Sequence, residues 1–250
     1  MSKAEKYRTQ LRSLAEWTPY LLKNSGLPGA RANLELVEAF ADLAGKQQVE
    51  AMLGIPAAQA PENSAQVFLV VCGVAALGKL VARGEPEHFA RLRALSGDPR
   101  WRVREAVAIA LQYVGDEDMQ RLLQEMREWA AGNWFEKRAC AAALAEPRLL
   151  KDQAAARQVL TILNRITKAI SAAGSPRDES FKVLCQSMGY CWSVAVAASP
   201  QNGKPLMEKW IASTNSDIRR IMSENLKKAR LERMDRNWVE RCKKQLQRSS

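Results

Sequence analysis

Residues 98–150 read DPRWRVREAVAIALQYVGDEDMQRLLQEMREWAAGNWFEKRACAAALAEPRLL, and this stretch decides the expected fold. Apolar residues in its first part recur three and four positions apart: Val103, Ala106, Val107, Ala110 and Val114. This spacing places them on one stripe of an α-helix. Asp98 suits the N-cap of that helix, and Pro99 suits its first position, where the missing N–H of proline costs nothing. The stretch is therefore expected to begin with an amphipathic helix.

Two breaks divide the rest of this stretch into further short helices. Gly115 is expected to end the first helix, and Asp116 is expected to cap the next one. The second helix carries apolar residues at helical spacing: Met119, Leu122, Leu123 and Met126. A second break at 131–133, with the sequence Ala-Gly-Asn, leads into a third helix at 134–144. The stretch is thus predicted to be a run of short helices joined by capped turns.

One pattern recurs along the chain: an apolar anchor, a turn with Asn or Asp, and an Arg that opens a helix nine residues after the anchor. The pairs of anchor and Arg are Leu95 and Arg104, Trp129 and Arg138, and Trp210 and Arg219. The first two Arg residues are 34 residues apart and the last two are 81 apart, which leaves room for two further units. Helix-pair repeats of the HEAT or armadillo type have periods of this order. We therefore expect an all-α fold, an α-α superhelix or solenoid of stacked antiparallel helix pairs.

The rest of the chain is also expected to be helical, because strand signals are scarce. A helix is predicted at 2–24, with a kink at Pro19, and another at 64–83 that is apolar nearly all round. Residues 54–64 contain two prolines and are expected to form a linker or a functional loop.

The ends of a solenoid need atypical repeats that cap the array. Residues 1–60 are therefore expected to form an N-terminal helical cap, and residues 61–250 the repeat array, within one continuous domain.

The net charge of +11 is concentrated in the second part of the sequence. Residues 1–150 contain 19 Lys and Arg against 18 Asp and Glu, whereas residues 151–250 contain 19 against 9. A basic part favours a polyanionic partner, because attraction to phosphates supplies most non-specific nucleic-acid binding. The alternative is a solvated basic surface, which many helical proteins have. We favour the polyanion.

The sequence gives no support to most familiar enzyme classes. His88 is the only histidine and no two cysteines are spaced as C-x-x-C, so neither a Ser-His-Asp triad nor a zinc site is indicated. No glycine-rich phosphate-binding motif is present. We therefore expect no metal and no cofactor, and chemistry that uses only carboxylates, aromatic rings and cations.

The odd number of cysteines, five, indicates reduced and mostly buried thiols. The first residues, MSKAEKYRTQ, are charged and lack the apolar segment of a secretory signal, which predicts a cytoplasmic protein. The longest apolar run, 67–77, is far shorter than the roughly 20 residues that a membrane helix needs. No membrane partner is expected.

One face of the first helix in the deciding stretch carries polar and aromatic residues. Four residues share the face opposite the apolar stripe: Trp101, Glu105, Ala108 and Gln112. A Trp and a carboxylate one turn apart on this face are candidates for a working surface. The alternative is that Trp101 packs against the next repeat beside a solvated Glu105, and the spacing alone favours this alternative.

The segments DPRWRVREAVA, REWAAGNWFEKRACAAAL and EPRLL resemble the HEAT-like repeat DNA-alkylation-repair proteins, a superfamily that includes bacterial alkylpurine DNA glycosylases. Its members tend to show a Trp with an acid four residues on, then a Trp-x-x-x-Asn turn, then an Arg followed by small residues. The matching residues here are Trp101 and Glu105, followed by Trp129, Asn133 and Arg138. The run at 146–149 is similar to a Pro-Arg-Leu run in one branch. The resemblance covers about the middle fifth of the chain.

A second register of the resemblance is open, because the block EKWIASTNSDIRR is also similar to the family pattern. In that register Trp192 takes the position of the Trp, and Val196, which has no chemistry, takes the position of the acid. The first register departs from the family pattern in two ways. It has a Glu rather than an Asp after Trp101, and its turn before Arg138 is one residue shorter.

The resemblance implies a DNA-binding protein that excises N-alkylated purines from duplex DNA. Glu105 would stabilise the oxocarbenium-like transition state and position water, and Trp101 beside it would attract the cationic base. Further contacts to phosphate, sugar or base would come from Arg104, Arg138, Arg148, Trp129 and Trp134. Trp129 and Trp210 also recur at the repeat anchor, a position typical of core residues.

Two non-catalytic hypotheses stand beside this one. A HEAT-like scaffold would bind DNA or RNA through basic residues of the later part: Arg165, Lys168, Arg219, Arg220, Lys227, Lys228 and Arg230. A protein–protein adaptor, the commonest use of helical solenoids, would carry an exposed apolar strip. We favour a protein that binds duplex DNA and resembles the alkylation-repair family, and we leave open whether it is catalytic.

Overall fold

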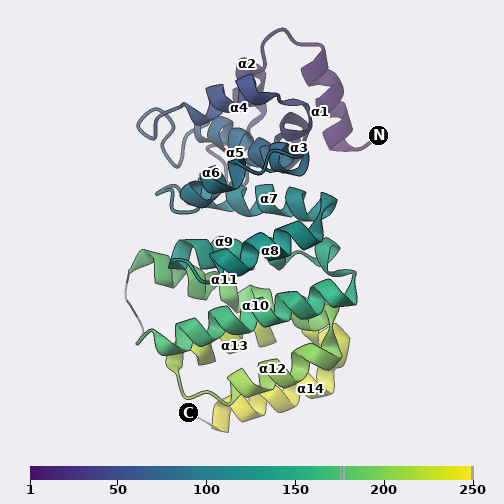
Figure 1. Cartoon of the computed structure of the whole chain (residues 1–250), viewed down its shortest axis with the longest axis vertical. Helices are drawn as coiled ribbons and strands as arrows, with labels where there is room; N and C mark the ends of the chain where they lie inside the picture. Colours follow the sequence, from purple (N-terminus) through teal and green to yellow (C-terminus); the bar gives the residue numbers. More distant parts are fainter. Residues whose placement is uncertain (175, 177, 249–250) are drawn as a thin grey trace. The chain divides into compact units, whose positions relative to one another are not determined.

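The computed structural model describes residues 1–174, 176 and 178–248 of the chain. These residues form α-helices and one short 3-10 helix, with no strand in the described part, so the all-α prediction is confirmed. The helices are labelled in Figure 1. The chain divides into two compact units, residues 1–117 and residues 118–250. We call these unit 1 and unit 2.

Unit 1 is built around one buried helix. Its helices are α1 (Lys3–Arg12), α2 (Thr18–Asn24), α3 (Leu34–Leu43), α4 (Lys46–Leu53), α5 (Val67–Ala82), α6 (His88–Leu95) and α7 (Trp101–Glu117). Helix α5 packs against α3, α4, α6 and α7, and fourteen of its sixteen residues are buried. The prediction of a helix that is apolar nearly all round is therefore confirmed. Because α3 and α4 pack directly on α5, residues 1–60 belong to the same compact unit as the residues that follow them.

The contact between α5 and α7 is the most extensive one between helices of the chain. A Cβ atom on Gly78 of α5 would lie 2.2 Å from the carbonyl oxygen of Ala110 in α7 and 2.5 Å from its Cα. The backbones of the two helices therefore approach as closely as a glycine allows. On the facing side of α7, the predicted apolar stripe is fully buried: Val103, Ala106, Val107, Ala110 and Val114.

Pro19 begins a helix instead of bending one, which corrects the expectation of a single kinked helix at 2–24. Helix α1 ends at Arg12, and α2 begins at Thr18 with Pro19 in its first turn. A proline fits the first turn of a helix, because the N–H that it lacks has no partner there. The indole N–H of Trp17 donates to the carbonyl of Leu11 at 2.8 Å and ties the intervening turn together.

The boundaries of α7 also differ from the expectation at both ends. The helix continues through Gly115 to Glu117, and Asp118, rather than Asp116, caps the next helix by accepting from the N–H of Arg121. Gly115 is buried, and it is not among the described glycines with a positive φ, so it has no left-handed conformation to stop the helix.

At the other end, Asp98 and Pro99 precede α7 without starting it. The Asp98 carboxylate accepts from the backbone and the side chain of Arg100 instead of capping the first turn.

Unit 2 repeats a helix and a capped turn several times. Its elements are α8 (Met119–Trp129), α9 (Trp134–Leu144), the 3-10 helix η1 (Pro147–Leu150), α10 (Gln153–Ala172), α11 (Glu179–Ala198), α12 (Pro200–Ile211), α13 (Ser216–Leu226) and α14 (Ala229–Arg248). Helix α11 packs between α9 and α13, and α10 contacts both α8 and α12, so alternate helices form two rows. The predicted break at 131–133 and the predicted helix at 134–144 are confirmed.

A buried asparagine joins α11 and α13, two helices of the row that α9, α11 and α13 form. The side chain of Asn225 accepts from the N–H of Ser193 at 2.7 Å and donates to the carbonyls of Met188 and Ile221 at 2.8 Å. It therefore links α13 to α11 at their centre.

None of the helices in the described residues is both long and apolar enough to cross a membrane.

We predict that Gly78→Ala destabilises the protein by about 3 kcal/mol, because the new methyl group meets backbone atoms of Ala110 and the two helices must separate. Urea unfolding measures this loss. Gly45→Ala is the matched control: its Cβ would meet only the end of the Gln48 side chain at 3.3 Å, so the expected cost is below about 1 kcal/mol. Equal unfolding midpoints for the two variants would contradict the close approach of α5 and α7.

Candidate functional site

Helix α7 presents an aromatic ring and a carboxylate at a hollow on the surface of unit 1. The hollow has a volume of about 210 Å³ and is lined by Leu34, Val71, Trp101, Arg102, Glu105 and Ile109, together with residues 30–32. We call it the Trp101 hollow. The described part of the chain exposes three large hydrophobic side chains, Met1, Leu34 (38% exposed) and Trp101 (45% exposed), and two of these three line this hollow.

Fewer residues are exposed on the outward face of α7 than the helical spacing predicted. Trp101 and Glu105 are exposed, but Ala108 is buried and Gln112 is half-buried. The indole of Trp101 lies under the Arg102 guanidinium, whose carbon is 4.4 Å from the ring centroid. With 45% of its surface exposed, Trp101 does not have the packed environment that the spacing favoured. The second register of the family resemblance offers no such surface, because Trp192 and Val196 are fully buried in α11.

A turn held by the buried Arg100 side chain fixes the first residue of α7. The Arg100 guanidinium donates to both carboxylate oxygens of Asp98, at 2.8 and 2.7 Å. This hydrogen bond raises the pKa of Arg100 above its ordinary value. Arg104, expected to hold phosphate, is only 5% exposed and donates to the carbonyls of Asp98 and Pro99 at 2.8 and 2.9 Å. Its guanidinium thus closes the turn that precedes Trp101.

The proline-containing loop at 54–64 is anchored to the same turn. Arg100 donates to the carbonyl of Ala60 at 3.2 Å, and the Arg102 Nε atom lies 3.4 Å from a carboxylate oxygen of Glu62. Arg102 also donates to the carbonyl of Gly29 at 3.3 Å. Two loops distant in sequence are therefore joined through Arg100 and Arg102 at the start of α7.

The second block of the family pattern lies in unit 2 and is largely buried. Trp129 is fully buried and donates to the Glu125 carboxylate at 2.9 Å, as a core residue does. Trp134 is half-buried, with its ring edge-on to Phe181 at 5.3 Å between centroids. Arg138 is buried at 8% exposure. Lys137, which the sequence did not single out, is also buried, and burial lowers its pKa.

The predicted phosphate-contacting residues of unit 2 differ in their environment. The exposed ones are Arg148, Arg165, Lys168, Arg220 and Lys227. Several have partners: Arg148 pairs with Glu146, Arg220 with Asp217 and Lys227 with Glu224. Arg219 is half-buried and donates to the carbonyl of Leu246. Of the two exposed residues on α10, Arg165 donates to the carbonyl of Arg127 at 3.2 Å, and Lys168 makes no ion pair in the described residues.

A basic groove lies between α11 and α13. It has a volume of about 670 Å³ and is lined by Lys182, Gly189, Tyr190, Arg220, Glu224 and Lys228, among others. Lys182 and Lys228 make no ion pair in the described residues. Lys182 was missed by the sequence analysis, although it shares a helical face with Gln186, Gly189 and Tyr190.

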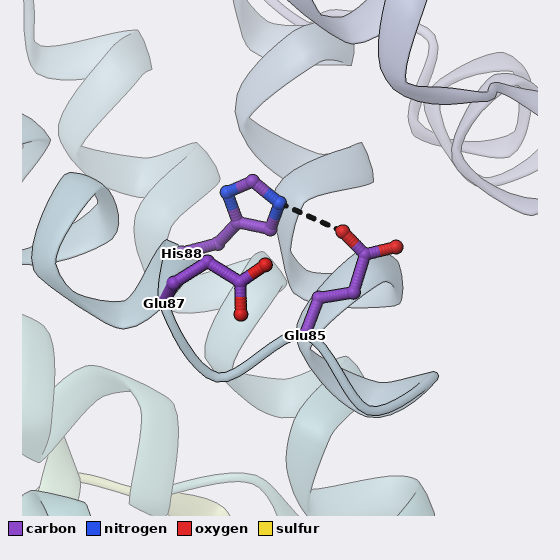
Figure 2. Close-up of side chains that lie close together, drawn as sticks. All are labelled: Glu85, Glu87 and His88. Carbon is purple, nitrogen blue, oxygen red and sulfur yellow. Dashed lines mark hydrogen bonds and ion pairs between the residues drawn. The ribbon is translucent and has the colours of Figure 1, made fainter.

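The described residues contain one group of side chains with metal-ligand chemistry, Glu85, Glu87 and His88 before and at the start of α6. Figure 2 shows the His88 ring directed at the Glu85 carboxylate, at a distance of 3.1 Å. The same carboxylate pairs with Lys46 at 2.8 Å, and this hydrogen bond lowers the pKa of Glu85. The cluster is thus already an ion-pair network between α4 and α6.

The five cysteines are free and buried, as expected. Burial raises the pKa of Cys191 to about 12 and that of Cys185 to about 11. A thiol with such a pKa is protonated at neutral pH and is a poor nucleophile.

Comparison with protein-family models finds no match for this chain, and comparisons with curated proteins and with solved structures find none either.

We predict that Asp98→Ala lowers stability by about 2–3 kcal/mol, because it leaves the buried Arg100 guanidinium without its carboxylate. Urea unfolding measures the change. In Glu146→Ala, the control, the lost partner is Arg148, whose side chain is 40% exposed, and the expected cost is below about 1 kcal/mol. A small effect of Asp98→Ala would show that the turn before Trp101 does not depend on this pair.

Proposed function

We propose that this protein binds duplex DNA and excises N-alkylated purine bases, with Trp101 as the base-binding residue and Glu105 as the catalytic carboxylate. One observation carries the proposal: both side chains are exposed, stand one turn apart on α7 and line the same hollow. The Asp98–Arg100 pair in the preceding turn and the close contact with α5 fix the helix that carries them.

The chemistry of this pair fits the proposed substrate. A purine alkylated at a ring nitrogen is cationic, and the face of an indole attracts such a cation. When the C1′–N bond breaks, both of its electrons pass to the purine, which leaves as a neutral base. The positive charge then develops on the sugar, where a carboxylate stabilises it. A water oxygen forms the new bond to C1′, and its proton passes to the Glu105 carboxylate.

The arrangement of helices supports the HEAT-like part of the proposal. In each unit, helices alternate between rows: α3, α5 and α7 pack consecutively in unit 1, and α9, α11 and α13 do so in unit 2. Stacked helix pairs produce such rows. We propose an α-α superhelix of the HEAT type on this basis.

The decisive experiment measures release of free base from duplex DNA that carries 3-methyladenine and 7-methylguanine. The wild type is expected to release base, and Glu105→Gln is expected to be slower by about 100-fold or more. Glu117→Gln, at the exposed C-terminal end of α7 and outside the hollow, is the matched control and should retain the wild-type rate. Absence of release by the wild type, or equal rates for wild type and Glu105→Gln, would contradict the catalytic proposal.

A second candidate function is a non-catalytic scaffold that binds nucleic acid through unit 2. The charge favours it: residues 118–250 contain 24 Lys and Arg against 14 Asp and Glu, whereas residues 1–117 contain 14 against 13. The groove between α11 and α13 also supports it, because Lys182, Arg220 and Lys228 line this groove. An adaptor for an apolar protein surface has less support, since Met1, Leu34 and Trp101 are the large hydrophobic residues exposed in the described chain.

Salt dependence of duplex binding tests the role of unit 2. Replacing Lys182 and Lys228 together by Gln is expected to reduce the slope of log K against log salt by about two, because each cation that contacts a phosphate contributes about 0.9. The control replaces Lys151 and Lys244, which are exposed and lie outside the groove, with the same change in charge. Equal slopes for the two double variants would show that the groove makes no phosphate contact.

A further inference from the structure

A second hollow adjoins the Trp101 hollow on unit 1. It has a volume of about 480 Å³, and its lining includes Lys3 and Lys6 of α1, Arg31, and Glu35 of α3. We call it the basic hollow. Arg31 and Ala32 line both hollows, so the two meet along this segment of the chain. All of these residues belong to unit 1.

The positive charges of the basic hollow are only partly neutralised by its own lining. Lys3, Lys6 and Arg31 are exposed, and none of the three makes an ion pair in the described part of the protein. Glu35 is the one acidic residue of the lining, so these four side chains carry a net charge of +2. The first turns of α1 and α3 also lie here, and the N-terminus of a helix carries a partial positive charge. The hollow is therefore suited to an anion.

The adjoining Trp101 hollow has the opposite character. Its lining is mainly apolar, with the exposed Leu34 and Trp101 side chains and the carboxylate of Glu105. Such a surface suits a flat ring, and the combination of indole and carboxylate favours a ring with positive charge. A ligand that occupies both hollows must join a ring to an anion over a short distance.

We propose that the two hollows form one site for an N-alkylated purine nucleotide, with the base against Trp101 and Glu105 and the phosphate on Lys3, Lys6 and Arg31. The identity of the base rests on the proposed function; the phosphate position rests on the basic hollow. Lys3, Lys6 and Arg31 are binding residues that no motif in the sequence indicated.

The test compares binding of 7-methylguanosine 5′-monophosphate and 7-methylguanosine to the full chain by isothermal titration calorimetry. The nucleotide is expected to bind about tenfold more tightly than the nucleoside, because its phosphate gains charged hydrogen bonds. The double variant Lys3→Gln, Lys6→Gln should lose most of this difference and keep its affinity for the nucleoside. Glu35→Gln should increase the difference, because it removes the one negative charge of the hollow.

Lys23→Gln is the matched control, since Lys23 is exposed in unit 1, makes no described ion pair and lies outside both hollows. Equal affinities of the wild type for nucleotide and nucleoside would overturn the phosphate position, and so would an equal loss in Lys23→Gln. Absence of binding by either compound would overturn the whole site.

Base release from methylated duplex, measured in parallel, separates this inference from the proposed function. Release without any preference for the nucleotide would overturn the basic hollow alone. Preference for the nucleotide without release would support the binding site and contradict the catalytic role of Glu105.

Discussion

The close approach of α5 and α7 is the constraint on which unit 1 and its candidate site depend. Gly78 lets the backbone at Ala110 come so near that no side chain fits between the helices. The inner side of α7 is thereby held against α5, and its outer side at Trp101 and Glu105 is left at the surface. Val71 of α5 forms part of the wall of the Trp101 hollow. The position of the site is therefore set by helix packing, and the loops only complete it.

Much of the fold follows from patterns within short segments. The apolar stripe of α7 and the limits of α9 were predicted because helical periodicity and a break between helices are local properties of the sequence. The predictions failed where the outcome depends on neighbours in space. Gly115 continues α7 because the helix is packed there, although a glycine at that position is typical of a helix end. Pro19 shows a second limit of local patterns. A proline suits both a kink within a helix and the first turn of a new helix, so the sequence alone does not choose between them.

The candidate site was likewise predictable only in the part that belongs to a single helix. Trp101 and Glu105 could be placed together from the sequence, because residues four apart share a face of any single helix. The opposite wall of the hollow, at Arg31 and Leu34, lies about 70 residues earlier in the chain, and helical periodicity carries no information about that contact.

Arg104 shows a further limit of spacing, which fixes the position of a Cα atom but not the direction of a long side chain. Here the guanidinium folds back to the carbonyls of Asp98 and Pro99. A residue that periodicity assigns to one face can therefore act on the turn beside it. The same freedom explains why the number of basic residues in a segment is a poor guide to how many of them remain available for phosphate.

The excess of basic residues lies in unit 2, whereas the Trp101 hollow lies in unit 1. The two features respond differently to salt. Attraction of a polyanion to unit 2, with its net charge of +10, weakens strongly with salt because it depends on the release of counterions. Contact of a ring with Trp101 and Leu34 depends on burial of apolar surface, which salt does not screen. Under the proposed function, the attraction of unit 2 for a polyanion and the contact of a base with Trp101 and Leu34 are two contributions to the free energy of binding that respond differently to salt.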